Sequence, residues 1–226
     1  MTPAPHSDPL PDAGGLDHPD PQVRGRAVEA LAEQRGARSR ELLRQRLADD
    51  DWVVRFKAAR ALAWMGDDAG AALLAEALAQ RDLCFMALQA LAALGSPTSL
   101  PALQRFFHRR FLHPLERMQA AAALVRCGDE SAADWLALRL ESRRPEERGF
   151  ALELWGRLER PDARQRLEAV LADPADPQRL DAVRGLAQLG DRAALALLRR
   201  VAAEPGDAEL AAEARAAADW LEEPAS

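Results

Sequence analysis

The stretch that decides the fold is Val54 to Asp67, which reads VRFKAARALAWMGD. Its small and aliphatic side chains stand 12, 8, 5, 4 and 1 residues before Gly66, and these positions share one arc of a helical wheel. The glycine suits the left-handed position that ends a helix, and Asp67 can cap the next helix through its side-chain oxygen. The stretch therefore predicts a helix, a tight turn and a second helix.

Variants of this stretch recur along the chain with a nearly constant period. The positions that correspond to Gly66 are Gly36, Gly66, Gly95, Gly128, Glu159 and Gly190, which stand 30, 29, 33, 31 and 31 residues apart. One helical hairpin buries too little surface to be stable alone, so this period indicates stacked repeats. The predicted fold is an all-α solenoid of about six two-helix repeats.

These repeats resemble HEAT repeats, and the pattern V-R-x-x-A-A-x-A-L-x-x-x-G-D resembles their short phycobilisome-lyase (PBS lyase) type. The resemblance covers roughly residues 18–220 and implies a right-handed superhelix. Because the family consists mostly of scaffolds and adaptors, it implies a non-enzymatic protein that binds another protein along a concave face. It leaves open a bilin lyase or isomerase, a chaperone-like factor, and a nucleic-acid binder of the DNA-alkylation-repeat kind.

The ends of the chain differ from the repeats in composition. Residues 1–17 are rich in Pro and Asp and lack apolar periodicity, which predicts a disordered tail. Residues 18–221 form the predicted solenoid, closed by a terminal capping helix that contains Trp220, and residues 222–226 form a C-terminal tail. The first 21 residues hold four acids and no base, and residues 204–226 hold seven acids and one Arg. These acidic ends would repel phosphates and argue against nucleic acid as a partner.

The sequence indicates no enzyme active site, metal or cofactor. It contains no GxSxG, Walker A or HExxH motif, and none of its four histidines forms the His-Glu pair of deoxyhypusine hydroxylase. The two cysteines, Cys84 and Cys127, lack ligand spacing, and no run of 18 apolar residues occurs. We therefore expect a cytoplasmic protein that is not an enzyme and does not enter membranes, with lyase-like activity as the alternative.

Arginines on the second helices suggest a partner-binding site. We expect these helices to line the concave face, where the guanidinium forks would bind an acidic segment of a partner protein. A basic and aromatic stretch after residue 104 adds stacking groups that are typical of interfaces. The predicted site comprises Arg105, Phe106, Phe107, Arg109, Arg139, Arg143 and Arg200. A solvated arginine face, with the phenylalanines in the core, is the alternative interpretation.

A second candidate surface lies on the first helices. In four repeats an apolar residue stands ten positions before the glycine that ends the first helix, at a position away from the buried arc. These residues are Phe56, Phe85, Met118 and Leu180. They predict an apolar strip on the convex side, suited to self-association or to a partner helix. Packing between adjacent first helices explains the same pattern, and the sequence does not define the oligomeric state.

Overall fold

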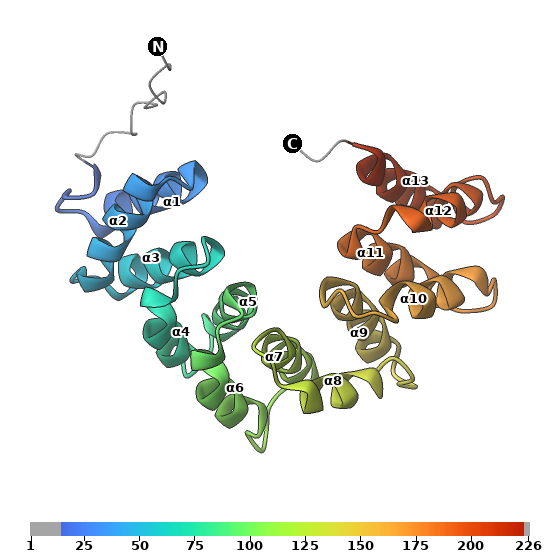
Figure 1. Cartoon of the computed structure of the whole chain (residues 1–226), viewed down its shortest axis with the longest axis horizontal. Coiled ribbons are helices and arrows are strands. Elements are labelled where there is room, and N and C mark those ends of the chain that lie inside the picture. Colours follow the sequence, from blue (N-terminus) through green and yellow to red (C-terminus); the bar gives the residue numbers. More distant parts are fainter. Residues whose placement is uncertain (1–14, 224–226) are drawn as a thin grey trace, which may run out of the picture. The chain divides into compact units, whose positions relative to one another are not determined.

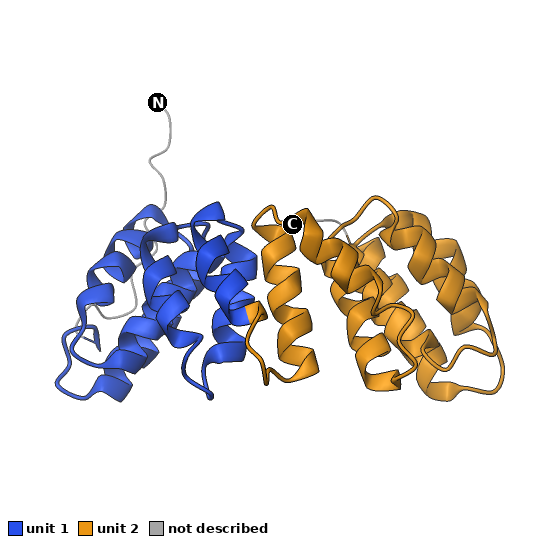
Figure 2. Ribbon diagram, turned by 90° about the horizontal axis from the view of Figure 1, so that it is seen from below, with its two compact units in different colours: residues 1–106 blue, residues 107–226 orange. Residues whose placement is uncertain are grey.

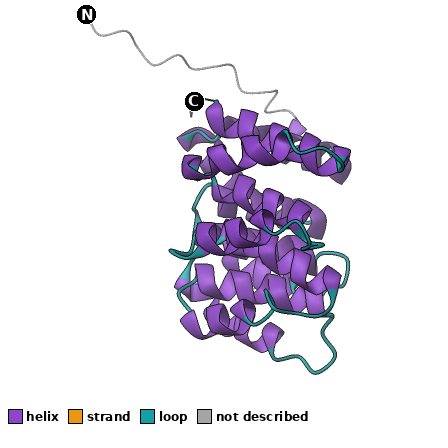
Figure 3. Ribbon diagram, turned by 90° about the vertical axis from the view of Figure 1, so that its right-hand side faces the viewer, coloured by secondary structure: helices purple, strands orange, loops and turns teal. Residues whose placement is uncertain are grey.

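The structure, a computed structural model, describes residues 15–223, which divide into two compact units with the boundary after Phe106 (Figure 2). The described part of unit 1 is 15–106 and that of unit 2 is 107–223. Both consist of helices and connecting loops, and no strand occurs in the described residues (Figure 3).

Each repeat forms a helical hairpin, as predicted. The helices of unit 1 are α1 (Pro21–Gln34), α2 (Ala37–Gln45), α3 (Trp52–Trp64), α4 (Ala71–Ala77), α5 (Cys84–Leu94) and α6 (Leu100–Phe107), whose last residue belongs to unit 2. The other helices of unit 2 are α7 (Pro114–Arg126), α8 (Glu130–Ala137), α9 (Pro145–Arg157), α10 (Ala163–Ala172), α11 (Arg179–Leu189), α12 (Leu195–Ala202) and α13 (Ala208–Glu222). The last helix packs on α11 and α12. The predicted all-α repeat fold is confirmed.

Within each unit the helices form two layers (Figure 1). The first helices of neighbouring repeats pack closely on one another, α1 on α3 and α3 on α5 in unit 1, and α7 on α9 and α9 on α11 in unit 2. The second helices contact first helices but stand farther from one another. Because the first-helix layer is the more closely spaced, each unit curves with its first helices on the inner side. The expectation that second helices line the concave face is therefore wrong; we call the first helices the inner layer and the second helices the outer layer.

Left-handed residues end the first helices. Gly66, Gly95, Gly128 and Gly190 have φ of 71, 61, 100 and 72°, and Glu159 adopts 50° without being glycine. In the first repeat the left-handed residue is Arg35, with φ of 46°, while Gly36 is extended and precedes α2. The position assigned to Gly36 is therefore one residue too late, and Arg35 is the residue that corresponds to Gly66.

Carboxylates cap the second half of three hairpins, as their sequences predict. Asp67, Asp129 and Asp191 each accept a hydrogen bond from the amide two residues later, at 3.1, 3.2 and 2.9 Å. Ser96 occupies the equivalent position, but its hydroxyl pairs with the Thr98 hydroxyl at 2.9 Å. Asp51 caps α3 by accepting from the amides of Val53 and Val54.

The arginine of the V-R pair joins successive repeats. In five repeats this guanidinium donates to backbone carbonyls of the preceding linker or second helix, and the residues are Arg24, Arg55, Arg117, Arg148 and Arg179. Arg24, Arg148 and Arg179 also donate to a carboxylate 25 or 28 residues later in the chain. This arginine clasp satisfies carbonyls that a helix end leaves open. Cys84 takes its place in the third repeat, where the thiol donates to the Arg81 carbonyl instead.

Glycines allow α9 and α11 to approach closely. A Cβ on Gly156 would lie 2.0 Å from the carbonyl oxygen of Gly185, and a Cβ on Gly149 would lie 2.5 Å from the carboxylate of Asp181. No side chain fits at these contacts. The degenerate fifth copy has therefore lost its terminal glycine but uses an internal one for packing.

Parts of the two predicted tails, 15–17 and 222–223, fall within the described residues. Most of the predicted N-terminal tail, residues 1–14, lies outside the described residues, as do residues 224–226. Leu16 is buried in the core of unit 1, and the Asp17 carboxylate lies 3.0 Å from the Arg46 guanidinium. Helix α13 continues to Glu222. No helix in this described range is long and apolar enough to cross a membrane.

Candidate functional site

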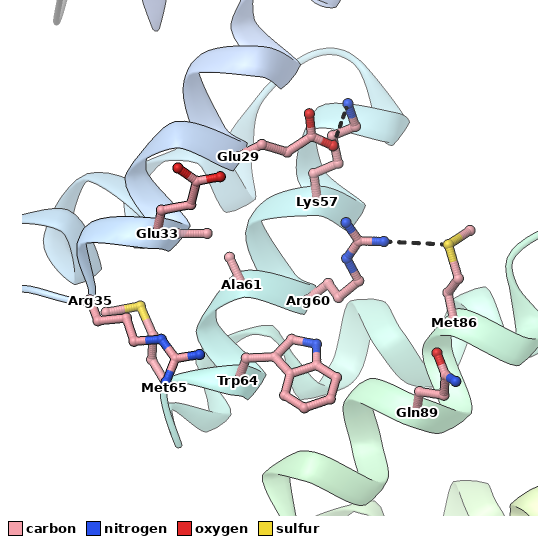
Figure 4. A pocket seen from close by; sticks show the side chains of 11 residues that line it. Glu29, Glu33, Arg35, Lys57, Arg60, Ala61, Trp64, Met65, Met86 and Gln89 are labelled. Atoms are coloured by element: carbon pink, nitrogen blue, oxygen red, sulfur yellow. Dashed lines mark hydrogen bonds and ion pairs between the residues drawn. The ribbon is translucent and has the colours of Figure 1, made fainter. Parts of the chain in front are cut away.

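The inner layer of unit 1 carries a hollow between α1, α3 and α5 (Figure 4). Lys57, Arg60, Ala61 and Trp64 stand on one face of α3, because they are spaced by three or four residues. Helix α1 contributes its last two turns to one side of the hollow, and Met86 of α5 stands on the other (Figure 4). The hollow has a volume of about 570 Å³, within the range of pockets that hold small ligands or side chains of a partner.

An exposed indole dominates this hollow. Trp64 is 55% exposed although it belongs to α3, whose other apolar residues are mostly buried. Tryptophan combines a large apolar surface with a hydrogen-bond donor, and it is enriched among residues that contribute most to protein interfaces. Its position favours contact with a partner over a role in the core.

The charged groups of the hollow differ in how they are neutralised. The Lys57 ammonium lies 3.0 Å from the Glu29 carboxylate. The Arg60 guanidinium instead donates to the sulfur of Met86 at 3.3 Å, and thioethers are weak acceptors. No carboxylate in residues 15–223 lies within ion-pair distance of Arg60. Figure 4 shows the guanidinium directed toward Met86, away from Glu33 of α1.

The inner layer of unit 2 has a different character, because its charges neutralise one another. Arg184 lies 3.9, 3.8 and 3.4 Å from the carboxylates of Glu153, Asp181 and Glu213. Arg157 adds a second cation at 3.8 Å from Glu153. Burial raises the pKa values of Glu153 and Asp181 above their ordinary range, and the neighbouring arginines offset this only in part. We interpret this network as a structural element between α9, α11 and α13.

The predicted outer-layer site is only partly assembled. Phe107 packs edge-on against the Trp135 ring, with centroids 5.1 Å apart, and the Arg139 guanidinium lies 3.8 Å from the centroid of the same ring. Trp135 thus joins two predicted residues, although it was not part of the predicted site. Phe106 is buried and cannot contact a partner in this structure, so its inclusion in the site is wrong.

The remaining predicted arginines are exposed and lie on different helices and loops. Arg105 lies on α6 of unit 1, and Arg200 lies on α12 of unit 2. Arg143 stands between α8 and α9 beside a shallow hollow that includes His113. Arg109 is exposed in the loop after α6, and its carbonyl accepts from Arg117 at 2.7 Å. All these residues belong to the outer layer or to loops, so they do not line an inner face.

The four apolar residues of the predicted strip do not form a continuous exposed surface. Phe56 and Met118 are buried, Leu180 is half-buried, and Phe85 is 40% exposed. Close packing between neighbouring first helices covers this position, because the inner layer is the tighter one. Packing between adjacent first helices, the alternative interpretation of this pattern, therefore describes the structure better than an exposed strip.

Sequence reasoning missed Trp64 and Arg60, although both stand in the stretch that decides the fold. Two residues before the left-handed residue that follows each first helix, the chain carries Glu33, Trp64, Ala93, Arg126, Arg157 and Gln188. A tryptophan at a position that is otherwise polar or small was the available signal. It was not used because the inner layer was assigned to the wrong helices.

Neither cysteine has the environment of a catalytic nucleophile. Neither thiol forms a disulfide, both cysteines are buried, and burial raises the pKa of Cys127 to about 11. Within residues 15–223 no group of three or more His, Cys, Asp or Glu side chains is arranged to hold a metal ion.

The chain matches two family models. The model of HEAT repeats matches residues 14–83, and the PBS lyase HEAT-like repeat matches residues 178–204. The comparison with curated protein sequences gave no match.

Among solved structures, the chain is similar to the complex of CpcE and CpcF of phycocyanin lyase from Nostoc sp. PCC7120. The identity is 20%, the match covers 97% of this chain and 100% of that chain, and the TM-score is 0.55. It is also similar to human deoxyhypusine hydroxylase in complex with glycerol, with 21% identity, 92% and 94% coverage and a TM-score of 0.41. At these identities the likeness concerns the fold alone.

The stacked hairpins and their curved inner layers define a helical-repeat protein. The chain contains HEAT repeats, and the repeat over residues 178–204 is of the PBS lyase type.

Proposed function

We propose that this protein is a non-enzymatic scaffold or adaptor that binds another protein through the inner layer of unit 1. The observation that carries the proposal is the Trp64 indole, which stands 55% exposed in a hollow on the inner side of that layer. A large aromatic side chain beside a hollow is typical of an interface anchor, because covering it removes much apolar surface from water.

The outer-layer arginines support a competing location for the partner. Arg105 and Arg200 are exposed and could bind an acidic segment of a partner protein. Their position outside the inner layer makes Trp64 the better supported anchor. The two locations can be separated by substitution.

The test is a pull-down from nuclease-treated native extract, in which the tagged full chain is compared with Trp64→Ala and with the double variant Arg105→Glu/Arg200→Glu. Trp220→Ala is the matched control, because Trp220 is 56% exposed and lies on α13 of unit 2. We expect a stoichiometric protein companion that is lost with Trp64→Ala and retained with the other variants. Loss only with the double variant would move the site to the outer layer.

A bilin lyase-like function is the second candidate. The match to a PBS lyase HEAT-like repeat over residues 178–204 supports it, as does the phycocyanin lyase named in the similar solved complex. The hollow is large enough for part of a tetrapyrrole, and Arg35, Lys57 and Arg60 would suit its carboxylates. The absorbance spectrum of the same eluate tests this candidate: a visible chromophore that requires Arg60 would support it, and a colourless eluate with a protein companion would favour the adaptor.

A further inference from the structure

We propose that Arg60 binds a carboxylate of the partner, so that the hollow on unit 1 selects an extended peptide segment in which an acidic residue stands two positions from an apolar one. The inference rests on the proposed function, because it assigns a partner chemistry to the same surface. The apolar residue would lie on Trp64, and the acid would replace the weak acceptor that Arg60 now has.

The first argument is a comparison of two arginines at the same repeat position. Arg60 and Arg184 each stand six residues before the left-handed glycine of their repeat, on the inner layer of their units. Arg184 has three carboxylates within 4.0 Å, whereas no carboxylate of the described residues reaches Arg60. The fold therefore supplies acids for this guanidinium in unit 2 and leaves its donors available in unit 1.

The second argument concerns the neighbours of Arg60. Lys57 stands one turn earlier on the same helix face, but Glu29 already neutralises it at 3.0 Å. The contact from Arg60 to Met86 involves one terminal nitrogen and a thioether. A guanidinium presents five donors in a planar fork, which matches the two oxygens of a carboxylate far better than one sulfur atom.

The third argument is the pairing of Arg60 with Trp64. The two residues are four apart on α3 and project from one face of the helix into the same hollow (Figure 4). In an extended peptide successive side chains point to opposite faces, and side chains two positions apart share one face, so that an acid and an apolar side chain at that spacing can reach both groups together. The pair thus distinguishes an acidic and apolar segment from a purely charged one.

The experiment selects peptides from a phage-displayed library of random linear sequences on the full chain and measures their affinities by fluorescence anisotropy. We expect the selected peptides to carry Asp or Glu two positions from an apolar residue and to lose affinity with Trp64→Ala. Arg60→Gln should weaken binding roughly tenfold, and Arg60→Lys by less, because lysine keeps the charge without the fork. Arg38→Gln, which removes an exposed arginine of α2, is the matched control and should have no effect.

A double-mutant cycle gives the decisive outcome. Changing the acid of the peptide to its amide should cost about as much as Arg60→Gln, and the two changes together should cost no more than either alone. Selected peptides that depend on Trp64 but not on Arg60 would overturn this inference and leave the proposed function standing. If no selected peptide depends on Trp64, both proposals fail.

Discussion

The Arg148 guanidinium donates two hydrogen bonds to the Asp176 carboxylate, at 2.7 and 2.6 Å, although the two residues are 28 positions apart in the sequence. The same side chain donates to the Leu140 carbonyl at 2.9 Å, so that it links the end of one repeat to the start of another. Both side chains are mostly buried, which makes this pair a structural one. It predicts that the V-R arginine stabilises the stack.

Replacing Arg148 by Ala should lower the free energy of unfolding by about 2 kcal/mol, because it removes charged hydrogen bonds and leaves Asp176 partly buried without its partner. Urea unfolding followed by circular dichroism measures the change. Arg143→Ala is the control, since Arg143 is exposed in the neighbouring loop. Equal stabilities of the two variants would show that the clasp does not stabilise the repeats.

The free energy of unfolding at acidic pH offers a related test. Hydrogen bonds from Arg148 lower the pKa of Asp176 below its ordinary value of 3.8. The pair therefore contributes stability that is present above pH 3.8 and is lost as the pH falls through the lowered pKa. The difference in free energy of unfolding between wild type and Arg148→Ala should become smaller as the pH is lowered in this range. A constant difference would contradict a stabilising Arg148–Asp176 pair.

Glu153 should show the opposite dependence. Burial raises its pKa above 4.5, so the folded protein binds more protons than the unfolded chain once the pH exceeds 4.5. Stability from this group therefore falls as the pH rises through the raised pKa. Glu153→Gln removes the effect and should gain stability relative to wild type as the pH rises from 4.5 to neutral. Glu146→Gln, on the exposed first turn of the same helix, is the control for urea unfolding across this range.

Gly156→Ala should be among the most damaging small substitutions, because its Cβ would meet the Gly185 carbonyl oxygen at 2.0 Å. We expect α9 and α11 to separate, with a loss of about 3 kcal/mol in the free energy of unfolding. Gly36→Ala provides a matched control, since its Cβ would have no neighbour closer than 3.9 Å and its φ is negative. Thermal unfolding of both variants measures the contrast, and equal melting temperatures would refute the close packing.

The Cys127 thiol should react slowly in the folded protein. Burial raises its pKa to about 11, so on the order of a thousandth of it is thiolate at pH 8. In a Cys84→Ala background, labelling with a chromogenic disulfide should be slow in buffer and fast in urea. Rapid labelling of the folded protein would show that this helix end opens readily.

The sequence by itself determined the repeats, because their chemistry is local. Apolar spacing predicts the buried side of each helix, and the aspartates after the helix ends predict the caps that Asp67, Asp129 and Asp191 form. Ser96 and the Arg35 turn are two departures from this scheme, and each concerns a single hydrogen bond or backbone angle.

The tertiary structure alone decided which layer is inner, and with it the candidate site. That choice depends on how closely neighbouring helices pack, which small residues such as Gly156 and Gly185 set by contacts between different repeats. The pairing of charges also depends on contacts between repeats. Arg148 pairs with a carboxylate in the loop before α11 and Arg184 with carboxylates on α9 and α13, whereas Arg60 donates to Met86. A periodic sequence shows that these arginines recur, but their partners are a property of the packed stack.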